Sequence, residues 1–460
     1  MTRDQLQAIL EDQQKLFNEG ATLSIKKRKQ LLRSIRDSLK RNESRIYEAL
    51  REDLNKSEFE AYLGEFVAML HEFDTAIRKV RRWSRKRRKA TPLITVPAKS
   101  YVFPEPYGKV LIVAPWNYPF DLAFSPLAGA IAAGNTATIK PSEFAPKCSQ
   151  IIQEIIQECC PNELVNVIQG DREVSKMLLE MPFDYIFFTG GIESGKEVMK
   201  KAAERLTPLT LELGGKNPAI IDPQYPIEEA AKKIAWGKFF NSGQSCVAPD
   251  YVLVHKDREK EFIESYKSFS KRFMENHESD YMKIVNEKHF DRLMGYLAQG
   301  EVLAGGESDR ESLFIWPTLI RPDSLQEPVM EEEIFGPVLP IITFNEKSEI
   351  LPITRSLGKP LVVNIFSNRR KEIAYWLGNT YSGNVVVNDS LINYVNKNLP
   401  FGGVGESGIG AYHGKASFDL FSHYRSVIHK LPPDLPLRYP PYNWQYKILR
   451  RLRKILNWGI

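Results

Sequence analysis

The spacing of hydrophobic and polar positions changes near residue 90 and divides the chain into two regions of different secondary structure. Before that point, apolar residues recur at helical spacing among charged ones, most clearly over 24–54, which predicts helices. Residues 79–90 are densely basic, and a solvated helical face with a linker explains them better than a nucleic-acid patch. No aromatic stacking platform accompanies these cations. Residues 94–103 are expected to be extended chain interrupted by proline.

After this segment, short apolar runs alternate with helical segments. The strands are expected at 110–113, 136–139, 164–168 and 185–188, and the helices at 122–133, 147–158, 173–179 and 195–205. This βαβα alternation predicts a parallel, doubly wound sheet with helices on both faces, a fold that binds nucleotides at the carboxyl ends of its strands. A second α/β set begins with a strand at 219–221, a helix at 226–240 and a strand at 251–254, and continues to about residue 390.

Composition limits the class of protein without naming a function. A chain of 460 residues is too long for one hydrophobic core and predicts two or three domains. The net charge of +6 is modest and points to no nucleic-acid partner. No apolar run reaches the length of a membrane span, the N-terminus lacks an apolar signal core, and neither HExxH nor CxxC supports a metal site. Four cysteines are too few for a disulfide scaffold and favour a reducing cytosol: Cys148, Cys159, Cys160 and Cys246.

The loop at 188–196 leaves an expected strand and enters an expected helix, where backbone amides and the helix dipole can hold phosphate. It nearly fits a P-loop through Gly190, Gly195 and Lys196. However, Glu197 stands where serine or threonine would bind magnesium, which makes a nucleoside triphosphatase the weaker alternative. Taken alone, the segment is equally compatible with a plain strand-to-helix turn.

Two further residues have chemical potential but are ambiguous in isolation. Glu212 ends an apolar strand, where partial desolvation would raise its pKa toward the range of a general base. The segment by itself favours a carboxylate that simply faces solvent. Cys246 lies among small and polar residues between a helix and a strand, as an exposed nucleophile would. An inert cysteine explains the same fragment equally well.

Six ordered motifs together resemble the aldehyde dehydrogenase superfamily. ELGGK at 212–216 precedes GQSC at 243–246, with Cys246 lying 34 positions after Glu212. The other matches are PWNYP at 115–119, GNT with KPSE at 134–143, EEIFGP at 332–337 and PFGGVGESG at 400–408. Residues 409–425 and 438–442 are similar to the class 3 and fatty aldehyde dehydrogenase group. The resemblance implies two doubly wound, Rossmann-like α/β domains plus a small β oligomerisation element.

The resemblance also assigns catalytic roles. Cys246 would attack the aldehyde as a thiolate, and the Asn117 amide with the Cys246 backbone N–H would stabilise the oxyanion. Glu212 would then activate water to hydrolyse the thioester intermediate. Intact catalytic residues argue against a decayed, non-enzymatic fold. Glu212 also favours hydrolysis over transfer of the acyl group to coenzyme A, because relatives that acylate coenzyme A commonly lack this base.

For the cofactor, the matching positions imply NAD, with NADP use possible. A carboxylate at Glu143 would repel a 2′-phosphate. Gly191 departs from the family, since many members carry serine or asparagine there, and altered phosphate contact is expected. The implied cofactor-binding residues are Trp116, Lys140, Glu143, Gly190, Gly191, Gly195, Glu333 and Phe335.

The resemblance further implies a domain plan and partners. Residues 1–80 and 102–210 would form the dinucleotide-binding domain, and residues 211–410 the catalytic domain. Residues 81–101 and 411–430 would form the oligomerisation element of a homodimer, and residues 431–460 would form the C-terminal tail. Tyr118 and Trp236 match positions that line the aldehyde tunnel, which suggests medium- or long-chain aliphatic or aromatic aldehydes. The tail at 447–458 predicts a basic amphipathic helix with Ile448, Leu449, Leu452, Ile455 and Leu456 on one stripe. The first interpretation is that this helix packs on its own or a partner subunit or gates the tunnel, and the second is that it contacts a membrane surface. The protein is otherwise expected to be cytoplasmic.

Overall fold

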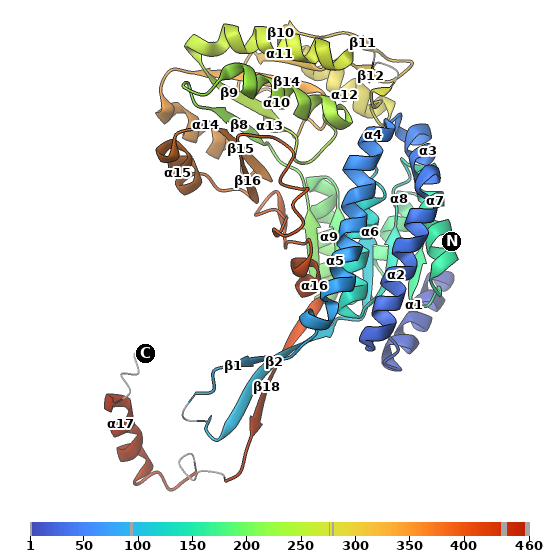
Figure 1. Cartoon of the computed structure of the whole chain (residues 1–460), viewed down its shortest axis with the longest axis vertical. Coiled ribbons are helices and arrows are strands. Elements are labelled where there is room, and N and C mark those ends of the chain that lie inside the picture. The colour runs from blue at the N-terminus through green and yellow to red at the C-terminus, as the bar shows by residue number, and fades with distance from the viewer. Residues whose placement is uncertain (1, 93–94, 276, 278–279, 434–438, 456–460) are drawn as a thin grey trace. The chain divides into compact units, whose positions relative to one another are not determined.

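The computed structural model describes residues 2–92, 95–275, 277, 280–433 and 439–455. The chain divides into two compact units, Met1–Trp83 with Pro106–Ser422, and Ser84–Glu105 with His423–Ile460. The first unit holds two large sheets, and the second holds a small sheet and the tail helix (Figure 1).

The first large sheet is the doubly wound sheet that the alternating pattern predicts. Its strand order is β17-β7-β6-β3-β4-β5, and every neighbouring pair is parallel except β17 with β7. The chain therefore starts in the middle of the sheet and winds outward in both directions, as in dinucleotide-binding folds. The strands are β3 (Lys109–Val113), β4 (Thr136–Lys140), β5 (Val165–Val167), β6 (Tyr185–Thr189), β7 (Leu209–Glu212) and β17 (Gly408–Ile409).

Helices cover both faces of this sheet because successive residues of each strand point to opposite faces. On β3, Val110 and Ile112 pack into one core cluster and Leu111 into another. The first cluster is closed by α2 (Ile25–Arg41), α5 (Val67–Trp83), α6 (Asp121–Ala133) and α7 (Pro146–Cys159), and the second by α1 (Arg3–Asn18), α8 (Arg172–Leu179) and α9 (Ile192–Arg205).

The second large sheet has the order β10-β13-β14-β9-β8-β15-β16, with only the edge pair β10 and β13 antiparallel. Its strands are β8 (Pro218–Ile221), β9 (Tyr251–His255), β10 (Gly300–Ala304), β13 (Thr318–Pro322), β14 (Val338–Phe344), β15 (Val362–Phe366) and β16 (Asn384–Val387). The helices around it are α10 (Ile227–Phe239), α11 (Glu259–Met274), α12 (Glu287–Leu297), α13 (Pro328–Glu331), α14 (Ile350–Ser356) and α15 (Arg370–Asn379). A two-stranded ribbon, β11 (Ser308–Asp309) with β12 (Phe314–Ile315), lies outside this sheet.

The remaining elements of the first unit include the segments that approach the site. They are α3 (Glu43–Leu54), α4 (Glu58–Ala61), the π-helical turn η1 (Tyr62–Phe66), the 3-10 turns η3 (Phe240–Gly243), η4 (Lys256–Arg258) and η6 (Lys347–Glu349), and α16 (Lys415–Leu420). A π-turn is rare in proteins and is frequent at functional sites.

The second unit contains a three-stranded sheet of order β1-β2-β18 and the helix α17 (Gln445–Ile455). The strands are β1 (Arg87–Lys89), β2 (Ala98–Pro106) and β18 (Ser422–Lys430). The prediction that helix and linker continue to about residue 90 is therefore wrong, because α5 ends at Trp83 and 87–89 pair antiparallel with β2. Leu456 and Trp458 of the predicted tail helix lie outside the described residues. Among the described helices, none is both long and apolar enough to cross a membrane.

Candidate active site

The carboxyl edge of the first sheet collects the ends of four neighbouring strands. Lys140 ends β4, Glu212 ends β7, Gly190 follows β6, and Trp116 lies just beyond β3. Because parallel strands present their carboxyl ends at one edge, the fold brings together residues that are nearly a hundred positions apart.

Glu212 is buried at this edge, with an exposed fraction of 4%. Neither carboxylate oxygen has a hydrogen-bond partner among the described residues, and burial raises the pKa of this carboxyl well above its ordinary value. Its main-chain carbonyl accepts the N–H of Gly190, which ties the candidate base to the phosphate loop. The isolated segment favours a solvent-facing carboxylate, and the structure overturns that interpretation.

The loop that carries Cys246 follows a break in helical geometry. Helix α10 ends at Phe239, and Asn241 and Ser242 in η3 adopt left-handed φ angles of 56° and 53°. Such conformations persist only where surrounding contacts hold them. Here the Asn241 N–H donates to a Glu60 carboxylate oxygen over 3.2 Å, and the Ser242 hydroxyl donates to the Met282 carbonyl over 2.8 Å.

Asn217 fixes the Cys246 loop from the other side. Its side-chain amide donates to the carbonyls of Cys246 (2.7 Å) and Ala248 (3.0 Å), while its side-chain oxygen accepts the N–H of Val362 (2.9 Å). The side chain is almost completely buried. The nucleophile's main chain is thereby fastened to the second sheet.

The Cys246 thiol is less accessible than the sequence suggests. The residue is half-buried, and burial raises the pKa of the thiol, with the nearby carboxylates of Glu333 and Glu212 raising it further. Both carboxylates therefore lie within electrostatic reach of the thiol. A thiol with a raised pKa needs a neighbouring base to form a thiolate.

Asn117 lies beside this thiol loop and is buried. Its side-chain amide donates to the Gln244 carbonyl over 3.1 Å, two residues before Cys246. Tyr118 is hydrogen-bonded to Ser245, the residue immediately before the cysteine. Asn117 and Tyr118, on the loop that follows β3 of the first sheet, therefore contact the segment that carries the nucleophile.

Glu333 and Phe335 lie on a loop held by three charged side chains. Lys216 donates to the Glu332 carbonyl (2.8 Å), Arg292 donates to the Ile334 carbonyl (2.8 Å), and Asp250 accepts the Ile334 N–H (3.0 Å). The Glu333 carboxylate packs so closely on Gly214 that a Cβ there would lie 1.9 Å from its oxygen. Burial, followed by the charge of Asp250, raises the pKa of Glu333 to about 8.

An aromatic contact places Phe335 next to Trp116. The two rings meet edge to face with their centroids 5.5 Å apart, and Phe335 has a left-handed φ of 49°. A bulky residue held in this strained conformation is typical of functional sites.

The glycines of the phosphate loop differ in what surrounds them. A Cβ on Gly195 would lie 2.7 Å from a Leu213 methyl carbon, so glycine lets α9 approach β7 closely. A Cβ on Gly190 would meet the Phe188 ring at 2.7 Å. Gly191 caps the N-terminus of α9, and a Cβ there would meet nothing within 4 Å. The loop thus leaves space in front of a helix N-terminus, which fits a phosphate group.

Lys140 and Glu143 form a pair at the end of β4. The ammonium lies 3.3 Å from the Glu143 carboxylate and donates to the Pro141 carbonyl over 2.7 Å. The lysine is buried, which lowers its pKa, whereas Glu143 is exposed. The exposed carboxylate is accessible to the hydroxyl group of a ligand that binds from solvent.

Comparison with known proteins decides the class. The model of the aldehyde dehydrogenase family matches residues 1–427. The chain belongs to this family. The 4,4′-diaponeurosporen-aldehyde dehydrogenase of Staphylococcus aureus is 41% identical over 449 residues, which cover 96% of this chain and 98% of that protein. The rat aldehyde dehydrogenase described as dimeric and NADP-preferring is 40% identical, covering 92% of this chain and 95% of that one.

The solved structures agree. The substrate-bound state of Staphylococcus aureus AldH superposes with a TM-score of 0.93 at 40% identity, covering 97% of this chain and 99% of that one. The predicted α/β aldehyde dehydrogenase fold is thus confirmed, and the relatives place the chain with the class 3 aldehyde dehydrogenases. It is an NAD(P)-dependent oxidoreductase that acts on aldehydes.

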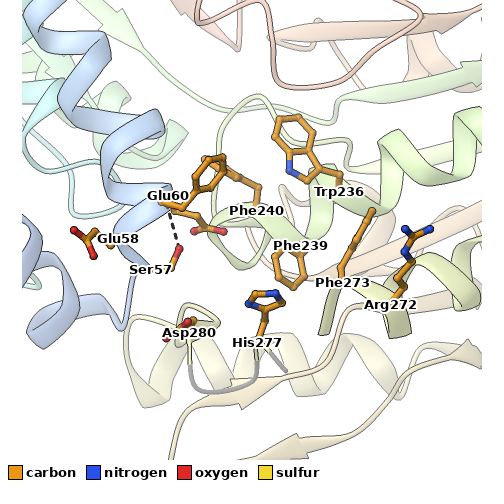
Figure 2. A pocket seen from close by; sticks show the side chains of 11 residues that line it. Ser57, Glu58, Glu60, Trp236, Phe239, Phe240, Arg272, Phe273, His277 and Asp280 are labelled. Atoms are coloured by element: carbon orange, nitrogen blue, oxygen red, sulfur yellow. Dashed lines mark hydrogen bonds between the residues drawn. The ribbon is translucent and has the colours of Figure 1, made fainter. Parts of the chain in front are cut away.

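In this aldehyde dehydrogenase, a cavity of about 460 Å³ lies next to the thiol loop. It is lined by Trp236 and Phe239 of α10, Phe240 of η3, Phe273 of α11 and Glu60 of α4 (Figure 2). Phe240 and Tyr118 both contact Gly64, where a Cβ would lie 3.4 Å and 3.2 Å from their rings. A layer of aromatic rings therefore connects this cavity to Tyr118, whose partner Ser245 precedes the nucleophile.

Sequence reasoning missed several residues that build the aldehyde dehydrogenase site. The Cys246 loop is held by Asn217, and the Glu333 loop is held by Lys216 and Arg292. For Asn217 and Lys216, their position just after Glu212 in the ELGGK motif was the available sequence signal. Arg292 lies on an ordinary amphipathic helix, whose pattern carries no such signal. Within the described ranges, no group of histidine, cysteine or acidic side chains is arranged to hold a metal ion.

Proposed function

We propose that the enzyme oxidises medium- or long-chain aliphatic or aromatic aldehydes to carboxylic acids through a thioester on Cys246, which Glu212 helps to hydrolyse. The observation that supports this most directly is a buried carboxylate without a partner, Glu212, within electrostatic reach of a thiol with a raised pKa. A buried carboxylate of this kind is suited to accept a proton near neutral pH.

Acylation begins with proton removal from the Cys246 thiol, a step that Glu212 assists but that is not its main task. The thiolate sulfur forms a bond to the carbonyl carbon, and the carbonyl π electrons move to oxygen. Asn117 and the Cys246 backbone N–H are the candidate donors to this oxyanion. In the absence of substrate, the Asn117 amide instead donates to the Gln244 carbonyl, which keeps it oriented beside the nucleophile.

The residues at the carboxyl edge fit a dinucleotide. The open space at Gly191 suits the phosphates, the Lys140 and Glu143 pair suits the adenosine ribose, and Glu333 suits the nicotinamide ribose. When bound, NAD(P) supplies the two-electron oxidant that converts the carbon attached to sulfur into a thioester. Because the exposed Glu143 carboxylate disfavours a 2′-phosphate, NAD is the proposed preference. The rat relative is described as NADP-preferring, and the assay below therefore compares both cofactors.

Deacylation again uses Glu212. Once Glu212 has released the thiol's proton to solvent, its carboxylate takes a proton from water as the water oxygen attacks the thioester carbon. The carbon–sulfur bond then breaks, and the departing sulfur takes this proton from Glu212, which releases the carboxylic acid and the Cys246 thiol. Because neither buried oxygen has a hydrogen-bond partner among the described residues, both can accept a hydrogen bond from a water molecule that enters the site.

The cavity supports the choice of substrate. Five phenylalanine and tryptophan side chains line a space large enough for a long acyl chain or a ring, and the Staphylococcus aureus relative is named as a 4,4′-diaponeurosporen-aldehyde dehydrogenase. NADH or NADPH production should be measured across aldehydes of increasing chain length, with each cofactor, with and without coenzyme A. Saturation at lower concentrations of long-chain aldehydes with NAD, and no acceleration by coenzyme A, is the expected result. A requirement for coenzyme A would contradict hydrolysis, and full activity of Cys246→Ser would contradict the mechanism.

We further propose that residues 1–80 and 102–210 bind the dinucleotide, that 211–410 carry catalysis, and that 81–101 with 411–430 assemble a homodimer. The rat relative is named as dimeric. Sedimentation of the full chain at several concentrations tests this proposal, and a monomer at every concentration would contradict it.

The proposed contact of 447–458 with a membrane is supported by charge. The second unit holds fourteen lysines and arginines against two carboxylates, a net charge of +12, although the whole chain has only +6. Exposed Trp444, Tyr446 and Ile448 accompany the exposed cations of α17, a combination typical of interfacial helices. Arg450→Glu with Arg451→Glu should abolish flotation on anionic vesicles at low salt, and unchanged flotation would leave packing or gating as the role of the helix.

A further inference from the structure

A fully buried lysine lies directly behind the predicted oxyanion donor. Lys56 stands between α3 and α4, and no part of its side chain is exposed. Its ammonium donates to the Asn117 carbonyl over 2.8 Å and to a Glu65 carboxylate oxygen over 2.9 Å. It also lies 4.3 Å from the centroid of the Tyr118 ring. One cation thus contacts two consecutive residues that the proposed reaction uses.

Glu65 extends this contact along the same segment. Its second carboxylate oxygen accepts the backbone N–H of Phe120 (2.8 Å) and of Asp121 (3.2 Å). The lysine and the glutamate together therefore hold the main chain of 117–121 at both ends. Glu65 is itself fully buried, on the π-helical turn η1.

The same contacts reach the nucleophile loop. The Asn117 carbonyl accepts a second hydrogen bond, from the Asn241 amide over 3.4 Å, and Asn241 also donates to the Gln244 carbonyl over 2.9 Å. The backbone N–H of Asn241 donates to Glu60, four residues after Lys56. The peptide that carries the Asn117 amide is therefore fixed between Lys56 and the loop of Cys246.

Stability alone does not explain a charge in this place. Burying an ion pair costs several kcal/mol per ion, and replacing such a pair by apolar residues of similar volume is often neutral or stabilising. A buried pair with three backbone hydrogen bonds to a single loop is better suited to fix the geometry of that loop.

We propose that Lys56 is a positioning residue, which orients the Asn117 amide toward the oxyanion and adds positive potential behind it. This inference rests on the proposed role of Asn117. The carboxylates that face the lysine come from its own segment, Glu60, and from η1, Glu65, and the aromatic face comes from Tyr118.

The test removes the charge pair together, so that no unpaired charge remains buried. Lys56→Met with Glu65→Leu should lower kcat by 10- to 100-fold and change KM by less than threefold. Loss of a whole oxyanion donor lowers kcat by about 10²–10³-fold, so a misoriented donor should lower it by less. The matched control is Lys109→Met, which alters a buried lysine at the opposite end of β3 and should leave kcat unchanged. Lys56→Gln, which removes the charge but keeps Glu65, is the second variant and should lower kcat at an unchanged KM.

A double-mutant cycle with Asn117→Ala separates positioning from a purely structural effect. If Lys56 acts through Asn117, its replacement in the Asn117→Ala background should lower kcat by less than a further threefold. An unchanged kcat in the Lys56 variants, or the full 10- to 100-fold loss repeated without Asn117, would overturn the inference. If Asn117→Ala itself has wild-type kcat, the proposed oxyanion role fails instead, and the two failures are thereby distinguishable.

Discussion

Replacement of Asn217 by alanine should damage stability and catalysis together, although this side chain is not expected to touch substrate. Asn217→Ala removes three hydrogen bonds and leaves the Cys246 and Ala248 carbonyls and the Val362 N–H buried without that partner. An unsatisfied buried polar group costs about 1–3 kcal/mol, so the lower bound for the three is about 3 kcal/mol. A displacement of the nucleophile by about 1 Å can lower the rate by about 10²-fold.

Urea unfolding and steady-state kinetics measure the two effects. The matched control is Asn364→Ala on the adjacent strand β15, since Asn364 is equally buried but donates to the Pro218 carbonyl alone (3.2 Å). We expect the control to lose about 1 kcal/mol of unfolding free energy and to keep its full activity. If Asn217→Ala kept wild-type kcat/KM and lost no more stability than the control, the argument that this amide fixes the thiol loop would be refuted.

Three further outcomes follow from the site. Burial raises the pKa of both Glu212 and Cys246, and the reactive form of this pair carries one proton fewer than the fully protonated form. Log kcat/KM should therefore rise by about one per pH unit between pH 6 and 8, and a flat profile would count against these roles. Burial raises the pKa of Glu60 to about 7, so ionisation destabilises the fold as pH rises above the unfolded-state pKa. In urea unfolding, Glu60→Gln should therefore have a free energy of unfolding on the order of 3 kcal/mol above wild type at pH 8, but little above it at pH 4. Equal gains at both pH values would contradict the role of Glu60 ionisation. Gly64→Ala should raise KM for long-chain aldehydes severalfold and spare short ones, because its Cβ would press on Tyr118 and Phe240; equal KM changes for both would argue against a shared path.

The strands β3 to β7 of the first sheet were predictable because buried parallel strands are short, continuous apolar runs, whereas β10 and β13 to β16 were expected only as part of a further α/β set. The expected strands at 110–113 and 185–188 differ from Lys109–Val113 and Tyr185–Thr189 by one residue at one end. The strand Arg87–Lys89 could not be predicted in this way, since all three side chains are exposed and charged and only pairing with β2 makes it a strand.

Within the site, sequence motifs identified the residues that carry chemistry but could not show what holds them. Cys246 and Glu212 stand in ordered motifs, whereas Lys56 follows a charged helix and has the pattern of a surface lysine. Its burial results from tertiary contacts with Glu65 and with a carbonyl 61 residues away. The sequence likewise could not show that the thiol is half-buried, because its neighbours in the chain are small and polar.

Single-turnover kinetics of Glu212→Gln test most directly whether Cys246 forms a thioester that Glu212 helps to hydrolyse. NADH should be followed by stopped flow, and the quenched protein should be examined by mass spectrometry. We expect a burst of up to one NADH per subunit, a steady-state rate at least about 10²-fold below wild type, and an acyl adduct on Cys246. A normal steady-state rate with no adduct on Cys246 would contradict this mechanism.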